Sequence, residues 1–515
     1  MHIVYKKVSI FNSNSKRANG LDWQKSTVQI FVSSNTPFMK KTIVCLGLAW
    51  SLAGAGIVMA ATEVPASVTI DASNPSAQIP DDYAGLSYET KRELADAEGK
   101  HYFSPDNAPL IQMLQTLGIK NLRIGGNTVD SAKVAIPVQA DIDSLFGCAK
   151  AANTKVIYSF RLNKGDPQGS ADQAKYIYDH YAANLICYSI GNEPDIYVHS
   201  YNGYLKEWKP IYDAINQVVP AAKYCAPSLT SNAQPWAHQF AADYASSGKI
   251  IYITQHEYAG GAGGKIKDPV YGRSLLLSPE WQQIYQTYYD KFVPPLKDSG
   301  LPYRLEEANN FYNGGAKDVS DTFASALWGV DYLYWWAAHG SKGINFHNGD
   351  EVAAGQQITI CRYASFTSVP DGYFAHPLAY GIKLFNLGAH GQMIASSVVP
   401  DDSAKDLNLV SYAVLGTDKN LYVTLINKEH GAAARDATVT IKAPVGYAGG
   451  QSIALVAPNN DESAKDGMTL GGNPIKHDGT WQEQWTDLPP AATPGQVQVK
   501  VPATSILLVR LTGAK

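Results

Sequence analysis

Short apolar strands alternate with longer amphipathic segments from Tyr83 to about Gly388, and this rhythm constrains the fold more than any other feature. Such alternation is typical of α/β units with parallel strands. The strand candidates are 83–89, 120–126, 154–162, 185–193, 223–229, 250–258, 303–311 and 343–348. The helix candidates are 108–117, 140–152, 171–183, 203–218, 234–246, 279–297, 319–339 and 375–387. Eight successive units predict a closed (β/α)₈ barrel, the TIM barrel, over residues 81–388 rather than an open sheet.

Two helix starts carry a recognisable signal. Ser170 followed by Gln173 fits a capping box for the third helix, and Ser278-Pro279 places proline at the first position of the sixth. We therefore expect these helices to begin at about residues 171 and 279.

After residue 388 the pattern changes to period two, which is typical of an antiparallel β-sandwich. We predict this domain over 389–515, with strands at 407–415, 421–426, 437–441, 453–456, 497–501 and 506–511. The segment 62–80 contains a further strand candidate, Ser67–Asp71, that is able to join the sandwich from the N-terminal side. No Pro- or Ser-rich linker separates the two domains, so we expect them to dock rigidly.

The N-terminal residues read as a targeting segment rather than as part of the fold. Met39-Lys40-Lys41 precedes an apolar run and small residues at Ala60 and Ala61, which predicts a signal peptide over 39–61. A membrane anchor is the alternative, but the run is short and interrupted by glycine. Residues 1–38 are interpreted as a misassigned upstream extension. The protein is then expected to be secreted or periplasmic, with no membrane association after cleavage.

The remaining composition argues against polyanionic partners. Without residues 1–60 the chain keeps 35 basic and 45 acidic residues, a formal charge of −10, and no cluster of Lys or Arg. Nucleic acid is therefore not expected as a partner, and a monomer is favoured. Four cysteines remain, mostly in apolar runs typical of buried residues; a Cys187–Cys225 disulfide is the open alternative.

Two carboxylates stand where predicted barrel strands end. Glu193 closes the fourth strand in Gly191-Asn192-Glu193-Pro194, and Glu307 lies late in the seventh. Catalytic groups of TIM barrels sit at the carboxyl ends of strands. Cleavage of a glycosidic bond needs one acid and a second carboxylate on the opposite side of the bond. The pair therefore indicates a glycosidase, and neither a metal nor a cofactor is expected.

Several short motifs carry a narrower resemblance. They are Leu122–Gly126 on strand two, Gly191–Pro194, His256-Glu257-Tyr258 on strand six, and Glu307 followed by Phe311–Gly315. In this order, and with the C-terminal sandwich, they resemble the bacterial β-glucuronidases related to heparanase, glycoside hydrolase family 79, within the clan of retaining (β/α)₈ glycosidases.

The resemblance implies a role for particular residues. It implies Glu193 as acid/base, Glu307 as nucleophile, Asn192 as partner of the sugar 2-hydroxyl and Tyr258 as a donor beside the nucleophile. It also implies that the turn containing Tyr312, Asn313 and Gly314 binds the carboxylate of the uronic acid. Heparanase carries glycine where this chain has Asn313. Backbone N–H groups in a glycine-rich turn do form anion-binding concavities.

Other residues have two readings. Glu306 adjoins Glu307, but strand residues alternate in direction, so only one of the two is expected to face the mouth. Glu89 and Asn127 end strands one and two. Each of them, like Tyr88, either contacts sugar hydroxyls or packs within the barrel. Arg123 is expected to pair with Glu307. For His347 and Asn348, substrate contact and a polar core are weighed evenly, while Tyr334, Trp335 and Trp336 are expected in the core.

The sequence thus predicts a retaining exo-β-D-glucuronidase that acts on terminal glucuronic acid of glycosides or glycans. An endo-β-glucuronidase acting on a glycosaminoglycan is the nearest alternative, and the absence of basic clusters argues against it. An inactive carbohydrate-binding protein is the alternative of another class. For the retaining mechanism the two carboxyl groups must lie about 5–5.5 Å apart, against roughly 6.5–9.5 Å for inversion.

Overall fold

The computed structural model describes residues 62–513 except residue 356, residues 491–492 and residue 494. The expectations for 1–38 and 39–61, including cleavage near Ala60 or Ala61, lie outside the described residues. Among the described residues, no helix combines the length and apolar character that crossing a membrane requires.

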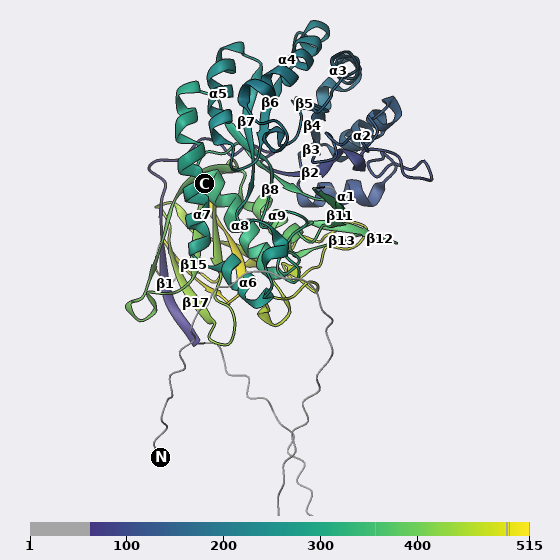
Figure 1. Cartoon of the computed structure of the whole chain (residues 1–515). Coiled ribbons are helices and arrows are strands. Elements are labelled where there is room, and N and C mark those ends of the chain that lie inside the picture. The colour runs from purple at the N-terminus through teal and green to yellow at the C-terminus, as the bar shows by residue number, and fades with distance from the viewer. Residues whose placement is uncertain (1–61, 356, 491–492, 494, 514–515) are drawn as a thin grey trace, which may run out of the picture. The chain divides into compact units, whose positions relative to one another are not determined.

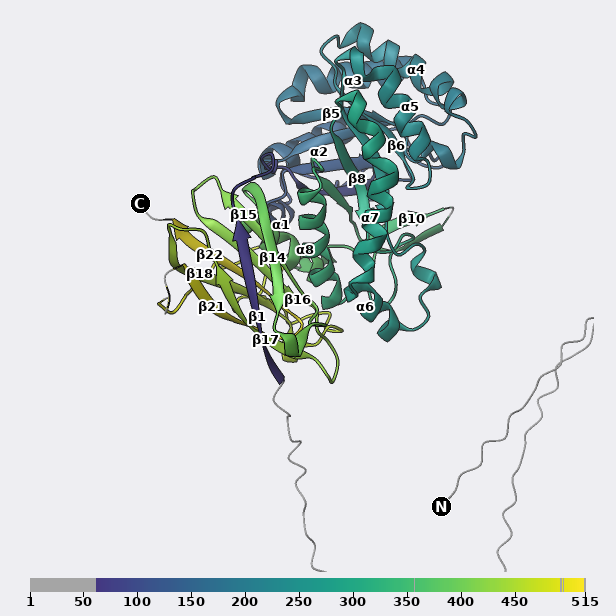
Figure 2. The same ribbon diagram turned by 90° about the vertical axis from the view of Figure 1, so that its left-hand side faces the viewer.

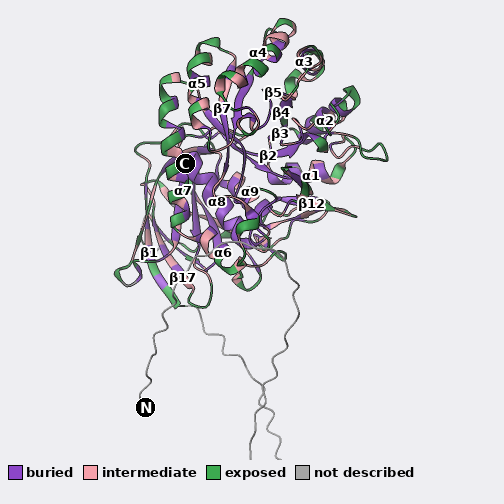
Figure 3. Ribbon diagram, in the orientation of Figure 1, coloured by how far each residue is buried: buried purple, intermediate pink, exposed green. Residues whose placement is uncertain are grey.

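Eight parallel strands close into a barrel, which confirms the predicted fold class (Figure 1). They are β2 (Ala84–Glu89), β3 (Asn121–Gly125), β4 (Lys155–Phe160), β5 (Leu185–Ile190), β6 (Tyr224–Leu229), β7 (Ile250–Tyr258), β8 (Tyr303–Asn309) and β9 (Ile344–His347). The barrel closes because β9 pairs with β2 in parallel. Nearly all their residues are buried, as expected of strands covered by helices outside and by packed side chains within (Figure 3).

Helices cover the outside of the barrel. They are α1 (Ala108–Leu117), α2 (Gln139–Ala152), α3 (Pro167–Tyr181), α4 (Tyr201–Val218), α5 (Gln234–Tyr244), α6 (Pro269–Leu277), α7 (Glu280–Phe292), α8 (Phe323–Ala338) and α9 (Pro377–Gly388). Most face the barrel with an apolar stripe and leave a polar face outside. Every residue of α8 but its last is buried, because this helix lies between the barrel and the sandwich.

Three helix predictions need correction. The third helix starts at Pro167 because the Asp166 side chain accepts from Gln168 N at 3.0 Å, so the capping box at Ser170 is wrong. The segment 279–297 is not one helix, since α7 ends at Phe292 and the prolines that follow lack the N–H that an α-helix needs. The helix α6 was not predicted; Asp268 caps it and proline follows.

Two hairpins interrupt the last βα unit, and neither was predicted. After β9 the chain forms β10 (Glu351–Ala354) with β11 (Gln357–Ile360), then β12 (Phe366–Val369) with β13 (Gly372–Ala375). They follow the carboxyl end of β9, so they lie at the same end of the barrel as Glu193 and Glu307.

The remaining strands form one ten-stranded sheet. They are β1 (Thr62–Asp71), β14 (Gly391–Pro400), β15 (Leu409–Gly416), β16 (Leu421–Asn427), β17 (Arg435–Lys442), β18 (Tyr447–Val456), β19 (Thr469–Leu470), β20 (Thr486–Asp487), β21 (Gln496–Val501) and β22 (Ser505–Gly513). Pairing is antiparallel except between β1 and β17. The strand β1 lies between β14 and β17, so the segment before the barrel completes the sheet (Figure 2). Alternate residues of β1, β15, β16, β17, β21 and β22 share one hydrophobic core.

The sheet domain packs on α8 and α9. Buried Asp331 of α8 receives the Tyr412 hydroxyl at 2.6 Å and pairs with Lys428 at 3.0 Å. A single hydrophobic cluster joins barrel residues such as Phe385 with sheet residues such as Leu508. The contact is therefore apolar with a buried ion pair at its centre.

Candidate active site

The first carboxylate stands on a tight turn after β5. Gly191 has φ +85°, and a Cβ there would meet the Leu162 side chain, so glycine is required. Glu193 itself adopts a left-handed conformation at φ +45°, which is uncommon outside glycine and recurs at functional sites. The turn is held by Asp130, which accepts from Asn192 N at 2.8 Å, and by Ser228 O, which accepts from Glu193 N at 2.8 Å. The strand predicted for 185–193 is therefore three residues too long at its carboxyl end.

The second carboxylate lies in a strand that is bulged. His256 on β7 pairs with Glu307 while Gln255 pairs with Leu305, so Glu306 is an extra residue in β8. A bulge interrupts the alternation of side chains. Glu306 consequently also faces the barrel interior, one layer below Glu307, where Cys225 Sγ lies 3.3 Å from its Oε2. The alternation argument for choosing between Glu306 and Glu307 is wrong, although Glu307 is the one at the mouth.

Glu307 is surrounded by three hydrogen-bond donors. Arg123 Nη1 donates to Oε2 at 2.8 Å, the Tyr258 hydroxyl donates to Oε1 at 2.8 Å, and His347 Nδ1 lies 3.2 Å from Oε2. Burial by itself favours the neutral acid, but the charges of His347, His256 and Arg123 outweigh it and hold the pKa of Glu307 well below its usual value. Glu307 is therefore ionised, as a nucleophile must be.

Within the described part of the chain, Glu193 has a single side-chain partner, His256, whose Nδ1 lies 2.9 Å from Oε1. The nearest ligand atoms of Glu193, His256 and Glu307 all lie within 4.8 Å of one another. Two carboxylates and an imidazole are possible ligands for a metal ion. Here, however, the donors Arg123, Tyr258 and His347 already surround Glu307, and a cation there would meet the positive charges of Arg123 and His347.

Glu306 and His256 form a second charged layer under the mouth. His256 Nε2 lies 3.9 Å from Glu306 Oε1, and both residues are fully buried. Burial disfavours both charges, yet the Glu307 charge, the hydrogen bond to Glu193 and the nearby Glu306 carboxylate raise the pKa of His256 to about 10. In the same way His256 and Arg123 overcome burial and lower the pKa of Glu306 to about 2. The imidazolium therefore lies between the two catalytic candidates and Glu306.

Arg123 links both carboxylate loops. Arg123 Nη2 donates to Asn192 Oδ1 at 2.8 Å, and Asn192 Nδ2 donates to Asn127 Oδ1 at 3.1 Å. The pairing of Arg123 with Glu307 is as predicted. Asn192 is thus fixed by Arg123 and Asn127, with its amide beside the two carboxylates.

Glu89 and Asn127 hold the β10–β11 hairpin. Glu89 Oε2 accepts from the backbone and hydroxyl of Thr128, both at 2.8 Å, and its Oε1 accepts from Ala353 N at 2.9 Å. Asn127 Nδ2 donates to Ala353 O at 2.8 Å. These side chains therefore bind the hairpin to the rim, and their predicted sugar contacts stay a prediction.

The turn after β8 lies beside Tyr258. The Tyr312 ring, 40% exposed, stands edge-on to the Tyr258 ring with centroids 6.2 Å apart. Asn313, Gly314 and Gly315 all have positive φ. Among the described residues, no acceptor binds the N–H groups of Asn313 and Gly314. Unpaired N–H groups in a left-handed turn are suited to bind an anion. The binding of a uronate carboxylate by this turn stays a prediction.

The other sequence candidates are structural. Tyr88 is buried against Tyr102 and Phe103 and accepts from Asn348 Nδ2 at 2.8 Å. Tyr334, Trp335 and Trp336 lie in the core, as predicted. Cys187 and Cys225 are buried and free, so the alternative disulfide is absent from the structure.

Sequence reasoning missed two supporting residues. His256 was noticed as part of a motif without a role, and Asp130 was not considered. Asp130 lies in the loop after β3, five residues beyond Gly125, and a carboxylate in a loop at the carboxyl end of a barrel strand was a signal that could have found it. Its Oδ1 accepts from Leu162 N at 2.7 Å and Asn163 N at 2.9 Å, which ties three barrel loops together.

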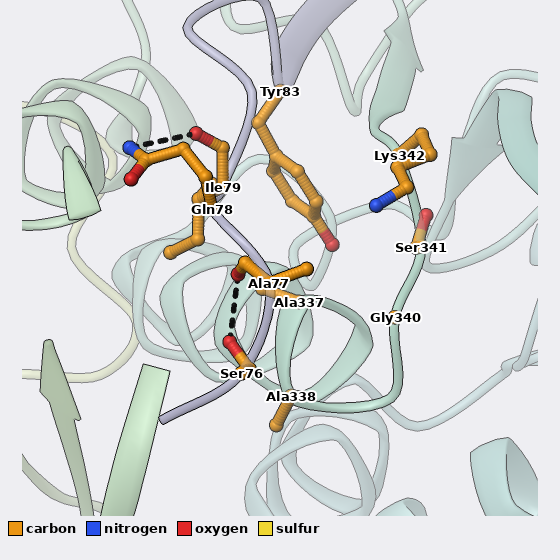
Figure 4. A pocket seen from close by; sticks show the side chains of 10 residues that line it. All are labelled: Ser76, Ala77, Gln78, Ile79, Tyr83, Ala337, Ala338, Gly340, Ser341 and Lys342. Carbon is orange, nitrogen blue, oxygen red and sulfur yellow. Dashed lines mark hydrogen bonds between the residues drawn. The ribbon is translucent and has the colours of Figure 1, made fainter. Parts of the chain in front are cut away.

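A cavity of about 50 Å³ lies at the opposite end of the barrel (Figure 4). Tyr83, just before β2, and Lys342, just before β9, contribute to its wall. Because both stand at the amino ends of strands, this cavity is separate from the carboxylate pair.

Sequence comparisons give two relatives named β-glucuronidase. The Aspergillus niger protein is 25% identical over 284 residues, 44% of this chain and 50% of the relative. The Neurospora crassa protein is 24% identical over 363 residues, 59% of this chain and 62% of the relative. The chain is therefore similar in sequence to two fungal β-glucuronidases. No family model matches it, and it spans 50% and 62% of the lengths of these two fungal relatives.

Comparison with solved structures shows which proteins share this fold. A 4-O-α-L-rhamnosyl-β-D-glucuronidase from Fusarium oxysporum superposes with a TM-score of 0.66 and 17% identity, covering 87% of this chain and 99% of the other. A family 51 arabinofuranosidase from Xanthomonas axonopodis superposes with a TM-score of 0.62 and 14% identity, covering 87% of this chain and 100% of the other. The fold of this chain is thus shared with these two enzymes.

Proposed function

We propose that this protein is a retaining exo-β-D-glucuronidase, with Glu307 as nucleophile and Glu193 as acid/base. The observation that carries the proposal is the pair itself. Two carboxylates at the barrel mouth have their nearest oxygens within 4.8 Å of each other, and their surroundings differ. This spacing favours retention, which needs about 5–5.5 Å between carboxyl groups, over inversion, which needs roughly 6.5–9.5 Å to admit water.

In the first step Glu307 attacks the anomeric carbon while Glu193 gives its proton to the leaving oxygen. Arg123, Tyr258 and His347 keep Glu307 ionised and aim one oxygen toward the sugar. In the second step Glu193 takes a proton from water, and the water oxygen attacks the same carbon to release the sugar. Asn192, held by Arg123 and Asn127, is placed to bind the sugar 2-hydroxyl.

Specificity for glucuronic acid rests on the turn of Tyr312, Asn313 and Gly314. The free N–H groups of this turn and the Tyr312 hydroxyl are suited to a carboxylate, and the two curated relatives are named β-glucuronidases. Exo action is supported by the β10–β11 hairpin, which Glu89 and Asn127 hold against the rim on one side. Export, with 39–61 as the leader, belongs to the same proposal.

The test is hydrolysis of p-nitrophenyl β-glucuronide beside p-nitrophenyl β-glucoside, with protein lacking residues 1–60. We expect strong preference for the glucuronide and a product that first appears as the β-anomer by NMR. Hydrolysis of the glucoside alone would remove the uronate assignment, and an α-anomer would remove retention. Binding of glucuronic acid without turnover of any β-glucuronide would favour the inactive carbohydrate-binding protein.

A further inference from the structure

Strand β7 directs its last side chains alternately to the outside and the inside of the barrel. Glu257 points outward, where its Oε2 accepts from the Tyr332 hydroxyl of α8 at 2.6 Å. A second cavity, of about 460 Å³, is lined there by Glu257 and Tyr258. The hydrogen-bonding groups of His256 and Tyr258 point inward, and His256 Nδ1 lies 2.9 Å from Glu193 Oε1. Glu257 is therefore outside the proposed reaction, whereas His256 contacts the acid/base candidate.

The other side of the His256 ring faces a second carboxylate, Glu306, in the layer below the mouth. His256 Nε2 and Glu306 Oε1 are 3.9 Å apart, and neither atom has a hydrogen-bond partner among the described residues. Both side chains are fully buried. Glu306 Oε2 lies 3.3 Å from Cys225 Sγ. One imidazole thus stands between Glu193 at the mouth and Glu306 beneath it.

The other two cations of the mouth have carboxylate partners of their own. Arg123 pairs with Glu307 at 2.8 Å. His347 lies 3.2 Å from Glu307 and 3.6 Å from Glu89. The charge of His256 is therefore met from below by Glu306, and a buried cation that loses such a partner is strongly destabilised.

The remaining titratable groups around this pair do not replace Glu306. Burial raises the pKa of the Cys225 thiol and of the Tyr204 and Tyr258 phenols, so all three are neutral. Cys187 packs beside Cys225 in a small buried cluster. Asp130, behind the turn of Glu193, accepts from backbone N–H groups and from a tyrosine hydroxyl. Glu306 is thus the carboxylate placed against the free nitrogen of His256.

This arrangement bears on the proton of Glu193. The first step of the proposed reaction needs Glu193 protonated, but an adjacent imidazolium favours the ionised carboxylate. A negative charge on the far side of the ring opposes that effect. Without it, the coupled pair of Glu193 and His256 would lose its first proton at lower pH.

We propose that Glu306 is a positioning residue that acts through His256 to keep Glu193 protonated for the first step. This inference rests on the proposed function. Glu306 touches neither the sugar nor the leaving group, and its contribution is the buried negative charge.

The experiment follows kcat/KM against pH for phenyl β-glucuronide, whose leaving phenol needs a proton, in the protein used to test the proposed function. Glu306→Gln keeps the shape of the side chain and removes its charge. We expect the alkaline limb to move to lower pH by about one unit. Glu306→Asp keeps the charge, so its alkaline limb should stay within about 0.3 unit of the unmodified protein whatever the loss in kcat.

His256→Gln removes the cation instead, so its alkaline limb should move to higher pH. In the double variant with Glu306→Gln both charges are gone, and the limb should return to within about half a unit of the unmodified protein. Glu257→Gln is the matched control, because it neutralises a buried glutamate of β7 that points away from the mouth. Its alkaline limb should not move.

An alkaline limb of Glu306→Gln that stays in place or moves to higher pH, with intact folding by thermal unfolding, would overturn the role of Glu306. If Glu306→Gln alone does not fold, His256→Gln is compared with the double variant, and equal limbs in these two would overturn it. Unmoved limbs in an active enzyme remove this inference alone. An unmodified protein that hydrolyses no β-glucuronide would remove the proposed function, and this inference with it.

Discussion

The two carboxylates of the mouth have different surroundings, and comparing them shows how one barrel can prepare the same side chain for two tasks. Glu307 is contacted by a guanidinium, a phenol and an imidazole, and it is almost completely buried. Among the residues that the structure describes, Glu193 has one side-chain partner; it stands on a left-handed turn and is more exposed. In the proposed mechanism the cations concentrate on the residue that stays ionised, and the residue that exchanges a proton is the one with access to solvent.

Removing the carboxylate of Glu307 should have the largest effect. Glu307→Gln keeps the size of the side chain but cannot form the covalent intermediate, so we expect kcat to fall by about 10⁴-fold or more. The measurement is hydrolysis of p-nitrophenyl β-glucuronide with excess enzyme. Near-normal turnover would refute the assignment of the nucleophile.

Removing the acid should depend on the leaving group. For Glu193→Gln we expect a loss of about 10²–10⁴-fold on a disaccharide, whose leaving oxygen needs a proton. The first step should remain fast with a dinitrophenyl glucuronide, whose leaving group needs none. Equal losses on both substrates would contradict the acid role, and Glu307→Gln is the control because it should not discriminate between them.

Tyr258→Phe removes one donor from Glu307 and leaves the ring. A hydrogen bond to a charged group contributes about 1.5–3 kcal/mol, so kcat/KM should fall roughly 10- to 150-fold. Tyr363→Phe is a suitable control, since Tyr363 packs against Tyr258 and makes no hydrogen bond to Glu307. An unchanged kcat/KM in Tyr258→Phe would show that Arg123 and His347 suffice.

His347→Gln should have the smallest effect and should be visible as a shift in pH dependence. Burial opposes the charge of His347, but Glu307 and Glu89 raise its pKa to about 9, so it is cationic at neutral pH. The pKa of Glu307 is depressed, so Glu307 is ionised above its own low pKa and activity is lost as pH falls through it. Removing the cation raises that pKa, and the acid limb of kcat/KM should move to higher pH by about one unit.

The control for this shift is His339→Gln, at the end of α8, where the imidazole bonds to Trp335 O rather than to a catalytic carboxylate. Its acid limb should stay in place. An acid limb that moves to lower pH in His347→Gln would contradict the cationic role.

Sequence reasoning located the barrel because each strand is short, apolar and separated from the next by an amphipathic helix. The period of the pattern was sufficient, since β7 was predicted with its observed bounds and α1 likewise. It placed Glu193 and Glu307 at one end of the barrel for the same reason. The start of α3 was misplaced, because Asp166-Pro167 competed with a capping box four residues later.

The bulge at Glu306 was outside the reach of sequence reasoning. The bulge depends on how β8 pairs with β7 and β9. The sequence of one strand does not specify its register with its neighbours. The two hairpins after β9 were missed because each strand has four residues, too short for a clear period. The pairing of Glu89 with the first hairpin was missed with them.

The barrel, the sheet domain and the two carboxylates at the mouth follow from the amino-acid sequence, because local hydrophobic periods and strand ends specify them. The donors around each carboxylate, the inward orientation of Glu306 and the cavity beside Tyr258 emerge only when the chain is folded. These features join residues far apart in the chain, from Arg123 on β3 to His347 on β9. Electrostatic environments depend on distances through space, and no local pattern encodes them.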